Sequence, residues 1–371
     1  MAATEAAGGA APPAGARGRF DALDGLRGFA VLLVFCVHAA GNVAVTVAGF
    51  DMANAHFTTA GSAGHRLLFW LYASHHGVFL FFVLSGFLIG RMWWPGPTQP
   101  YATFAWHRTL RIYPAFLLSF VASLAFAWAS GTWDPPDAGR VVANALFLNG
   151  APGSRVVAFN IVTWSLFYEM TFYLAFPALA LAARAGGARG GVALWVAGIA
   201  VPVAAALAGA DPLVLCWSLL FGGVALAVEE RRLRALAARM PAAAVVGVYL
   251  AVTTTALFEA VPGVVAIPAF GAAAVLLTAK CLAPGNAVAW VFTRAPLRAL
   301  GRISYSFYLL HWMLVVVTAR AVAEHVDRLG VVGAALAIFV GGFATSAAAA
   351  SALWWVAERP YFVARRRRAA Q

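Results

Sequence analysis

A histidine lies within the first long apolar segment of the chain, and an arginine precedes it. His38 follows Arg27 by eleven residues in the segment RFDALDGLRGFAVLLVFCVH, residues 19–38. On a helix this spacing is three turns, about 16 Å along the axis and about 20° from a common face. An imidazole titrates near neutral pH, so His38 is a candidate general base for a hydroxyl group. The alternative is a core histidine bonded to a backbone carbonyl.

Two more arginines stand one turn apart in the segment WHRTLRIYP, residues 106–114. On a helix Arg108 and Arg111 project together from the start of an apolar span. Paired guanidinium groups bind phosphates well, so this place suits a phosphate-rich donor such as a coenzyme A thioester. The alternative is that both are ordinary arginines at the membrane surface.

Polar residues recur at four-residue spacing where another apolar segment begins. Ser165, Glu169 and Tyr173 follow Trp164, and on a helix they form one polar stripe. Within a membrane, Glu169 must be paired or protonated. It could orient the His38 imidazole, pair with an arginine or bind acceptor hydroxyls, and the alternative is a purely structural ion pair.

A late segment, GRISYSFYLLH, carries a second histidine. Ser304 and His311 share a helix face, with Tyr308 between them. Ser304 could instead cap the helix, and the role of His311 is open between packing and substrate contact. We expect Trp164, Ser165, Tyr305, Tyr308 and His311 to contact the substrates.

The segment FLFFVLSGFLI, residues 79–89, places Ser85 and Gly86 in mid-membrane. The simplest interpretation is a close helix-packing point, because a serine nucleophile would need a base nearby. The preceding His75 and His76 point about 100° apart on a helix, which makes a poor metal site. We expect no metal.

The composition defines the class of protein. Hydrophobic residues make up 63% of the chain and charged residues 11%, far from the ~25% charged residues of soluble domains. Continuous apolar runs exclude a β-barrel and predict an all-α integral membrane protein. The net charge of +12 comes from arginines that flank apolar segments, so nucleic acid is not an expected partner. Three cysteines, Cys36, Cys216 and Cys281, give no disulfide framework.

We expect about ten transmembrane helices with both termini in the cytoplasm. With this topology, all but five of the 26 lysines and arginines lie on the cytoplasmic side, as the positive-inside rule requires. The five outer ones are Arg66, Arg140, Arg155, Arg320 and Arg328. The expected spans are 29–50, 67–90, 112–130, 161–183, 192–209, 212–228, 242–258, 263–282, 304–323 and 331–356.

The sequence divides the chain into three parts. Residues 1–18 are predicted to be a disordered tail, residues 19–360 a transmembrane domain, and residues 361–371 a basic cytoplasmic tail. Within the domain, the run 229–239 has the pattern of an amphipathic interfacial helix. The outer loop 131–160 is either a turn-rich connector or part of the site for an extracytoplasmic acceptor.

These motifs together resemble the acyltransferase family 3 membrane proteins, which O-acylate bacterial glycans and some secreted metabolites. The likeness extends over nearly the whole chain. It rests on Asp24-Gly25-Leu26-Arg27-Gly28 with His38, Phe-Phe-Val-Leu-Ser-Gly-Phe at 81–87, Arg-x-x-Arg-Ile-x-Pro at 108–114, Trp164-Ser165-Leu166-x-x-Glu169, Ser304-Tyr305 with Tyr308 and His311, and Glu358-Arg359-Pro360.

The resemblance implies that His38 is the essential histidine and that Arg27, Arg108 and Arg111 bind the donor. Some members carry a further esterase-like domain. This sequence stops at Gln371 without one, so a mechanism that needs it would require a separate partner protein.

The expected function is an O-acyltransferase of the bacterial cytoplasmic membrane, with His38 and Glu169 as catalytic residues. It would move an acyl group, acetyl by default, from acyl-coenzyme A to a carbohydrate, glycolipid or secreted-metabolite acceptor. The alternative function is a proton-coupled transporter or flippase for a polar lipid or glycan. The sequence leaves open the acyl group, the acceptor hydroxyl, direct transfer against an acyl-histidine intermediate, and the oligomeric state.

Overall fold

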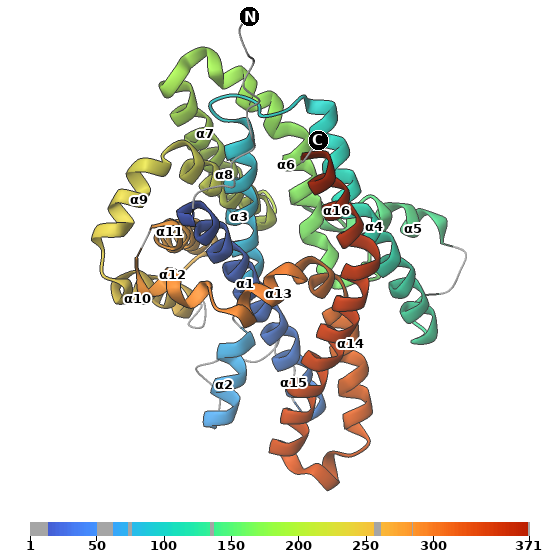
Figure 1. The fold of residues 1–371 in the computed structure, drawn as a ribbon. Helices are drawn as coiled ribbons and strands as arrows, with labels where there is room; N and C mark the ends of the chain where they lie inside the picture. The colour runs from blue at the N-terminus through green and yellow to red at the C-terminus, as the bar shows by residue number, and fades with distance from the viewer. Residues whose placement is uncertain are drawn as a thin grey trace, which may run out of the picture.

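The computed structural model describes residues 14–49, 62–72, 76–133, 137–255, 261–283 and 285–369, with side chains from 21 to 364. All regular secondary structure in these ranges is helical (Figure 1), which confirms the expected all-α class. The predicted tail 1–18 overlaps the first helix from residue 14. The rest of that tail, His75 and residues 134–136 of the outer loop lie outside the described residues.

Sixteen α-helices and one π-helical turn follow one another along the described chain. They are α1 (Ala14–Thr46), α2 (Ala63–Tyr72), α3 (His76–Trp93), α4 (Tyr101–Ala129), α5 (Ala138–Ala145), α6 (Trp164–Ala183), α7 (Gly187–Leu207), α8 (Leu215–Val228), α9 (Glu230–Arg239), α10 (Ala242–Thr255), α11 (Gly263–Leu282), α12 (Ala287–Phe292), α13 (Ala295–Arg302), α14 (Ser304–Ala323), α15 (Val326–Leu353), the π-helical turn Trp354–Glu358 and α16 (Arg359–Ala369).

The structure does not confirm ten spans. Within the described residues, seven helical stretches are long and apolar enough to cross a membrane, or up to eight if α8 and α9 form one bent span. One stretch, Ile161–Leu207, holds both α6 and α7. The expected spans 212–228 and 242–258 correspond to α8 and α10, which have 14 residues each. Such helices are about 21 Å long, shorter than the ~30 Å hydrocarbon layer.

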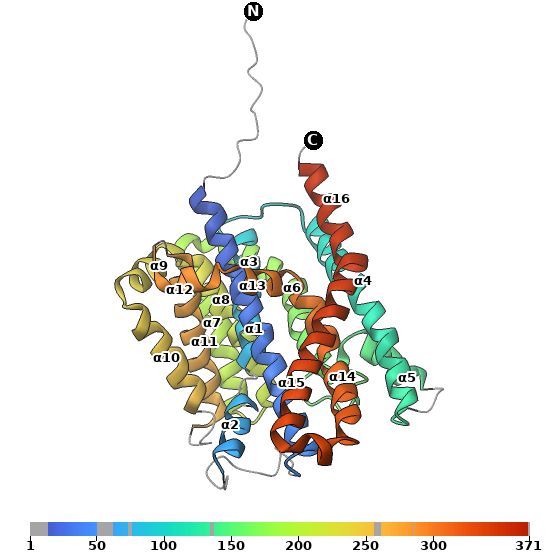
Figure 2. The same ribbon diagram turned by 60° about the horizontal axis from the view of Figure 1, so that its bottom comes forward.

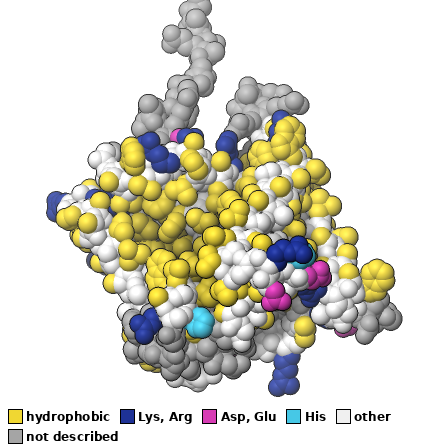
Figure 3. All heavy atoms as spheres, turned by 90° about the horizontal axis from the view of Figure 1, so that it is seen from below, with side chains coloured by type: hydrophobic (Ala, Val, Ile, Leu, Met, Phe, Trp, Pro, Cys, Tyr) yellow, Lys and Arg dark blue, Asp and Glu magenta, His cyan; other side chains and the backbone are white. Residues whose placement is uncertain are grey.

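The two ends of the described chain lie on one side of the bundle. In Figure 2, α1 begins and α16 ends at the top, an arrangement that an even number of crossings gives. Figure 3 shows hydrophobic side chains over the middle of one face, arginines along its upper edge and further charged side chains toward its lower part. This distribution suits a bundle in a bilayer. That the upper side is cytoplasmic stays a prediction.

Glycines bring two pairs of helices into backbone contact. A Cβ atom added at Gly86 of α3 would lie 1.8 Å from the carbonyl oxygen of Leu220 in α8, and one added at Gly223 would lie 2.1 Å from that of Val83. The same holds between α1 and α13, where a Cβ at Gly301 would lie 1.8 Å from the Asp24 carbonyl oxygen. Gly86 is therefore a packing point, as its sequence context predicted.

Replacement of Gly86 by alanine should destabilise the bundle. The added methyl group meets the Leu220 backbone, which cannot rotate away, so we expect a cost of about 1–3 kcal/mol and a lower unfolding temperature in detergent. Gly247→Ala in α10 is the matched control, because nothing lies within 4 Å of a Cβ there. Equal melting temperatures for the two variants would contradict the close contact of α3 with α8.

Candidate active site

One narrow cavity collects most of the polar residues that the sequence singled out. Its volume is about 80 Å³, and α1, α3, α4, α6 and α14 contribute its walls. On α6 the lining runs from Ser165 to Tyr173, about 12 Å along the helix axis, so the cavity is elongated. Its polar and charged lining residues are Arg27, Ser85, Arg108, Arg111, Ser165, Glu169, Tyr173, Ser304, Tyr305 and Tyr308.

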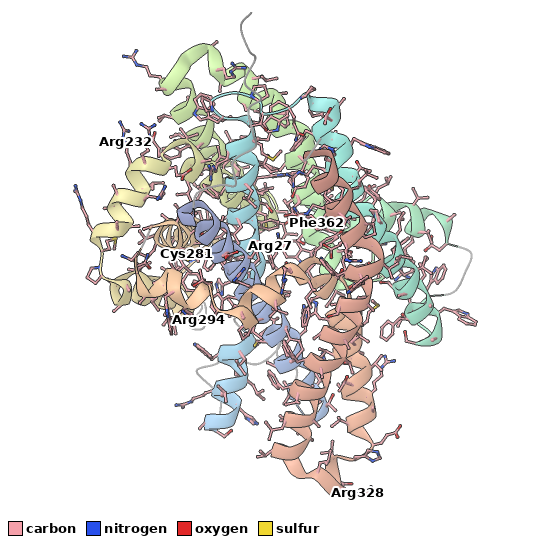
Figure 4. All side chains as sticks on the ribbon, in the orientation of Figure 1. Arg27, Arg232, Cys281, Arg294, Arg328 and Phe362 are labelled. Atoms are coloured by element: carbon pink, nitrogen blue, oxygen red, sulfur yellow. The ribbon has the colours of Figure 1, made fainter. Side chains whose placement is uncertain are left out.

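Three half-buried arginines surround one end of this cavity. The Arg108 guanidinium carbon lies 5.3 Å from the ring centroids of both Phe104 and Tyr173, and the Arg111 carbon lies 5.8 Å from that of Phe362. Figure 4 shows Arg27 on α1 and Phe362 on α16. Aromatic rings stabilise the cations here without using their N–H donors.

The arginines keep donors available for a ligand. In the described part of the chain, Arg27, Arg108 and Arg111 form no ion pair within 4.0 Å, and Arg108 donates only to the Met92 sulfur, at 3.1 Å. Glu169 is near enough to interact electrostatically with Arg27 and Arg108. Unpaired guanidinium groups around a half-buried cavity make a good site for phosphate groups.

Glu169 is hydrogen-bonded to a serine of another helix. Its Oε1 atom accepts from the Ser85 hydroxyl of α3. Ser85 was expected only at a packing point, and its role at the cavity was not predicted because nothing in the sequence places α3 beside α6. Of the roles considered for Glu169, orientation of the His38 ring finds no support, since no hydrogen bond joins the two among the described residues.

The opposite end of the cavity is a buried hydroxyl network. The Tyr308 hydroxyl donates to the Val162 carbonyl oxygen at 2.5 Å and lies 2.8 Å from the Ser165 oxygen. Beside it, the amide of Asn160, at the end of the outer loop, donates to the Leu309 carbonyl oxygen at 2.7 Å. The Asn160 end of the loop is therefore fixed to α14.

The two intramembrane histidines are neighbours. The ring centroids of His38 and His311 are 5.1 Å apart, with planes inclined by 52°. His311 is fully buried, and its Nδ1 donates to the Tyr308 carbonyl oxygen at 2.8 Å. Its Nε2 has no hydrogen-bond partner among the described residues. The His38 ring forms no hydrogen bond with any described residue. A packing role therefore fits His311, whose ring is bonded to its own helix, better than it fits His38.

Neither histidine lines the cavity itself. His311 lies one turn after Tyr308, a lining residue at the hydroxyl-network end, and their ring centroids are 5.9 Å apart. The histidine pair therefore lies just beyond the end of the cavity that is remote from the arginines. A chain extended along the cavity would have its far end directed at this pair.

Among the other expected substrate contacts, Tyr305 lines the cavity, and its hydroxyl donates to the Ile112 carbonyl oxygen at 3.1 Å. Trp164 does not line it, because its ring packs against Phe82 and Tyr168. Ser304 forms no capping hydrogen bond. Its buried hydroxyl lines the cavity and has no partner in the described part of the chain, so it could bind a ligand.

A further buried carboxylate lies close to the arginines. Glu358 ends the π-helical turn, and its Oε1 accepts from the Ser306 backbone N–H at 3.2 Å and hydroxyl at 2.5 Å. It interacts electrostatically with Arg111 and Arg27. Glu358 was noted only as part of a family motif and had no predicted role, because α14 and the π-helical turn meet only in the folded chain. π-Helical turns are frequent at functional sites.

Comparison with known proteins identifies the family. A model of the acyltransferase family 3, described as an acyltransferase domain, matches residues 20–354. The chain belongs to this family. Among the described residues, no three His, Cys, Asp or Glu side chains are grouped as they would be around a metal ion.

A curated relative of this acyltransferase family 3 chain is the acyltransferase MdmB of Streptomyces mycarofaciens. It is 32% identical over 169 residues, which are 43% of this chain and 38% of the relative. The match thus covers less than half of either protein. No solved structure matches the chain.

Loss of the Ser85 hydroxyl should impair acyl transfer without unfolding the protein. Ser85→Ala leaves Glu169 without its hydrogen bond inside the cavity, and we expect a loss of about tenfold in turnover. The assay is acyl transfer by purified protein in vesicles. The control is Ser351→Ala, whose hydroxyl is exposed and bonds only its own helix. Equal activity of both variants would show that the Ser85–Glu169 bond has no part in the reaction.

Proposed function

We propose that this protein is a membrane-embedded O-acyltransferase that moves an acyl group from acyl-coenzyme A to a hydroxyl group. The acceptor is a carbohydrate, a glycolipid or a secreted metabolite, and the membrane is the bacterial cytoplasmic membrane. The observation that carries the proposal is one cavity with three arginines at one end, which form no ion pair with any described residue, and the His38–His311 pair just beyond the other end.

The arginine end suits the donor. Coenzyme A carries several phosphate oxygens. Arg27, Arg108 and Arg111 can donate charge-assisted hydrogen bonds to these oxygens. Its pantetheine arm is a thin flexible chain, and the narrow, elongated cavity admits such a chain more readily than a sugar ring. A thioester at the end of the arm would then lie near His38. Acetyl is our default for the acyl group because the cavity is small.

The histidine end suits proton transfer. His38 is half-buried, and its ring has no hydrogen bond among the described residues, so a nitrogen is available to an acceptor hydroxyl. His38 takes the hydroxyl proton while the oxygen attacks the thioester carbon. As the tetrahedral adduct collapses, the carbon–sulfur bond breaks, and His38 returns the proton to the leaving thiolate. The carbonyl oxygen needs a hydrogen-bond donor, and the Ser165 hydroxyl at the histidine end of the cavity is the candidate.

Replacement of His38 by alanine should abolish transfer and leave donor binding intact, because the arginine end is unchanged. The test measures coenzyme A release and acylated envelope glycans or secreted metabolites by mass spectrometry in a deletion strain that carries each variant. His325→Ala, at an exposed position after α14, is the control. Normal acylation by a well-expressed His38→Ala protein would exclude this mechanism, and transport without coenzyme A release would favour the transporter.

Removal of a donor arginine should act mainly on KM. For Arg111→Gln we expect KM for acyl-coenzyme A to rise about tenfold or more, since a charged hydrogen bond is lost, with a smaller change in kcat. The exposed Arg328→Gln is the matched control. An unchanged KM in Arg111→Gln would place the donor phosphates elsewhere.

A further inference from the structure

Two more pockets meet at Glu229, where α8 turns into α9, and neither shares a lining residue with the active-site cavity. One is apolar and lies between α7, α8, α9 and α11, and the other is basic and is lined mainly from α7 to α9. The acyl-transfer mechanism uses neither of them. An apolar pocket beside a charged one matches the two parts of an amphiphile, which has a hydrocarbon chain joined to a charged head.

The apolar pocket has a volume of about 530 Å³. Small residues such as Gly222 and Gly271 line much of this pocket. Trp195 of α7 and two leucines of α9, Leu233 and Leu236, form the rest of its wall near α9. Ser218 is one of its few polar lining residues, and its hydroxyl already donates to the Leu215 carbonyl oxygen at 2.6 Å. The pocket therefore offers an occupant almost only apolar contact, which favours a hydrocarbon chain.

The basic pocket, of about 970 Å³, is lined by four arginines and two glutamates. Salt bridges account for two of the arginines, since Arg232 pairs with Glu229 at 3.1 Å and Arg234 with Glu230 at 3.3 Å.

The remaining two arginines, Arg189 and Arg231, are exposed and form no ion pair within the described residues. The pocket lining thus carries a net charge of +2, four positive less two negative. This excess on Arg189 and Arg231 complements a phosphate group.

α9 is fixed in place over the apolar pocket. It runs at 90° to the preceding helix, and the buried Lys280 of α11 donates to the carbonyl oxygens of Ala237 at 2.9 Å and Met240 at 2.7 Å. Figure 1 shows α9 beside α8 and α11, and Figure 4 shows Arg232 at its outer edge. Because α9 is anchored at its C-terminal end, the two pockets keep their relative position.

We propose that the two pockets together are a binding site for one anionic phospholipid. Its phosphate binds Arg189 and Arg231, and one of its acyl chains fills the apolar pocket beneath α9. The lipid enters sideways from the leaflet in which α9 lies. This site is independent of the acyl-transfer mechanism, and its test needs no enzyme assay.

Delipidated, full-length protein would be titrated with dioleoyl phosphatidylglycerol or dioleoyl phosphatidylcholine and followed by native mass spectrometry. We expect tighter binding of phosphatidylglycerol. The double variant Arg189→Gln/Arg231→Gln should weaken phosphatidylglycerol binding about tenfold or more and weaken phosphatidylcholine binding less, because the choline group of that lipid already offsets its phosphate charge. The control, Arg155→Gln/Arg328→Gln, removes the same charge at exposed positions outside both pockets.

A second variant tests the apolar pocket. Ala272 lines it and is exposed, so the larger side chain of Ala272→Phe should occupy part of the pocket and weaken binding of both lipids. Ala348→Phe, at an exposed position on α15, is its control. The proposal is overturned if either test variant binds lipid as its control does, or if inorganic phosphate at equal concentration displaces phosphatidylglycerol.

Discussion

Charge held inside an apolar bundle requires compensation, and this requirement shapes the centre of the molecule. Arg27, Arg108 and Arg111 are half-buried without direct ion pairs among the described residues. Aromatic rings and the nearby carboxylates of Glu169 and Glu358 reduce the cost of burying them. The carboxylates remain at a distance from the guanidinium groups, so a ligand with phosphate groups can supply the hydrogen bonds that the protein leaves unmade.

The same arrangement depends on close helix packing around the cavity. α1 supplies Arg27 and His38, and its glycine contacts with α12 and α13 set its position. α3 supplies Ser85 from a helix held against α8 at Gly86 and Gly223. These glycines do not line the cavity. They hold α1 and α3 at the positions from which the polar side chains of these helices reach the cavity.

The sequence predicted the membrane class, the family and the residues that line the cavity more successfully than the number of spans. Polar residues in apolar runs are conspicuous, so Arg27, Glu169 and Tyr308 could be identified from one chain. Contacts between distant segments could not: Ser85 with Glu169 and Ser306 with Glu358 arise from packing that no local pattern encodes. Ten spans were expected because hydropathy alone does not distinguish a full span from the 14-residue helices α8 and α10.

The most direct test of the central claim is to locate the thiol end of coenzyme A. In a chain without native cysteines, Ser165→Cys at the histidine end of the cavity would be incubated with coenzyme A disulfide. The protein thiolate attacks the disulfide, one coenzyme A leaves as a thiolate, and intact-mass spectrometry detects the mixed disulfide. We predict modification of Ser165→Cys, prevented by excess acyl-coenzyme A, and no such protection at the exposed Ser351→Cys. An unmodified Ser165→Cys that reacts only after denaturation would contradict the account.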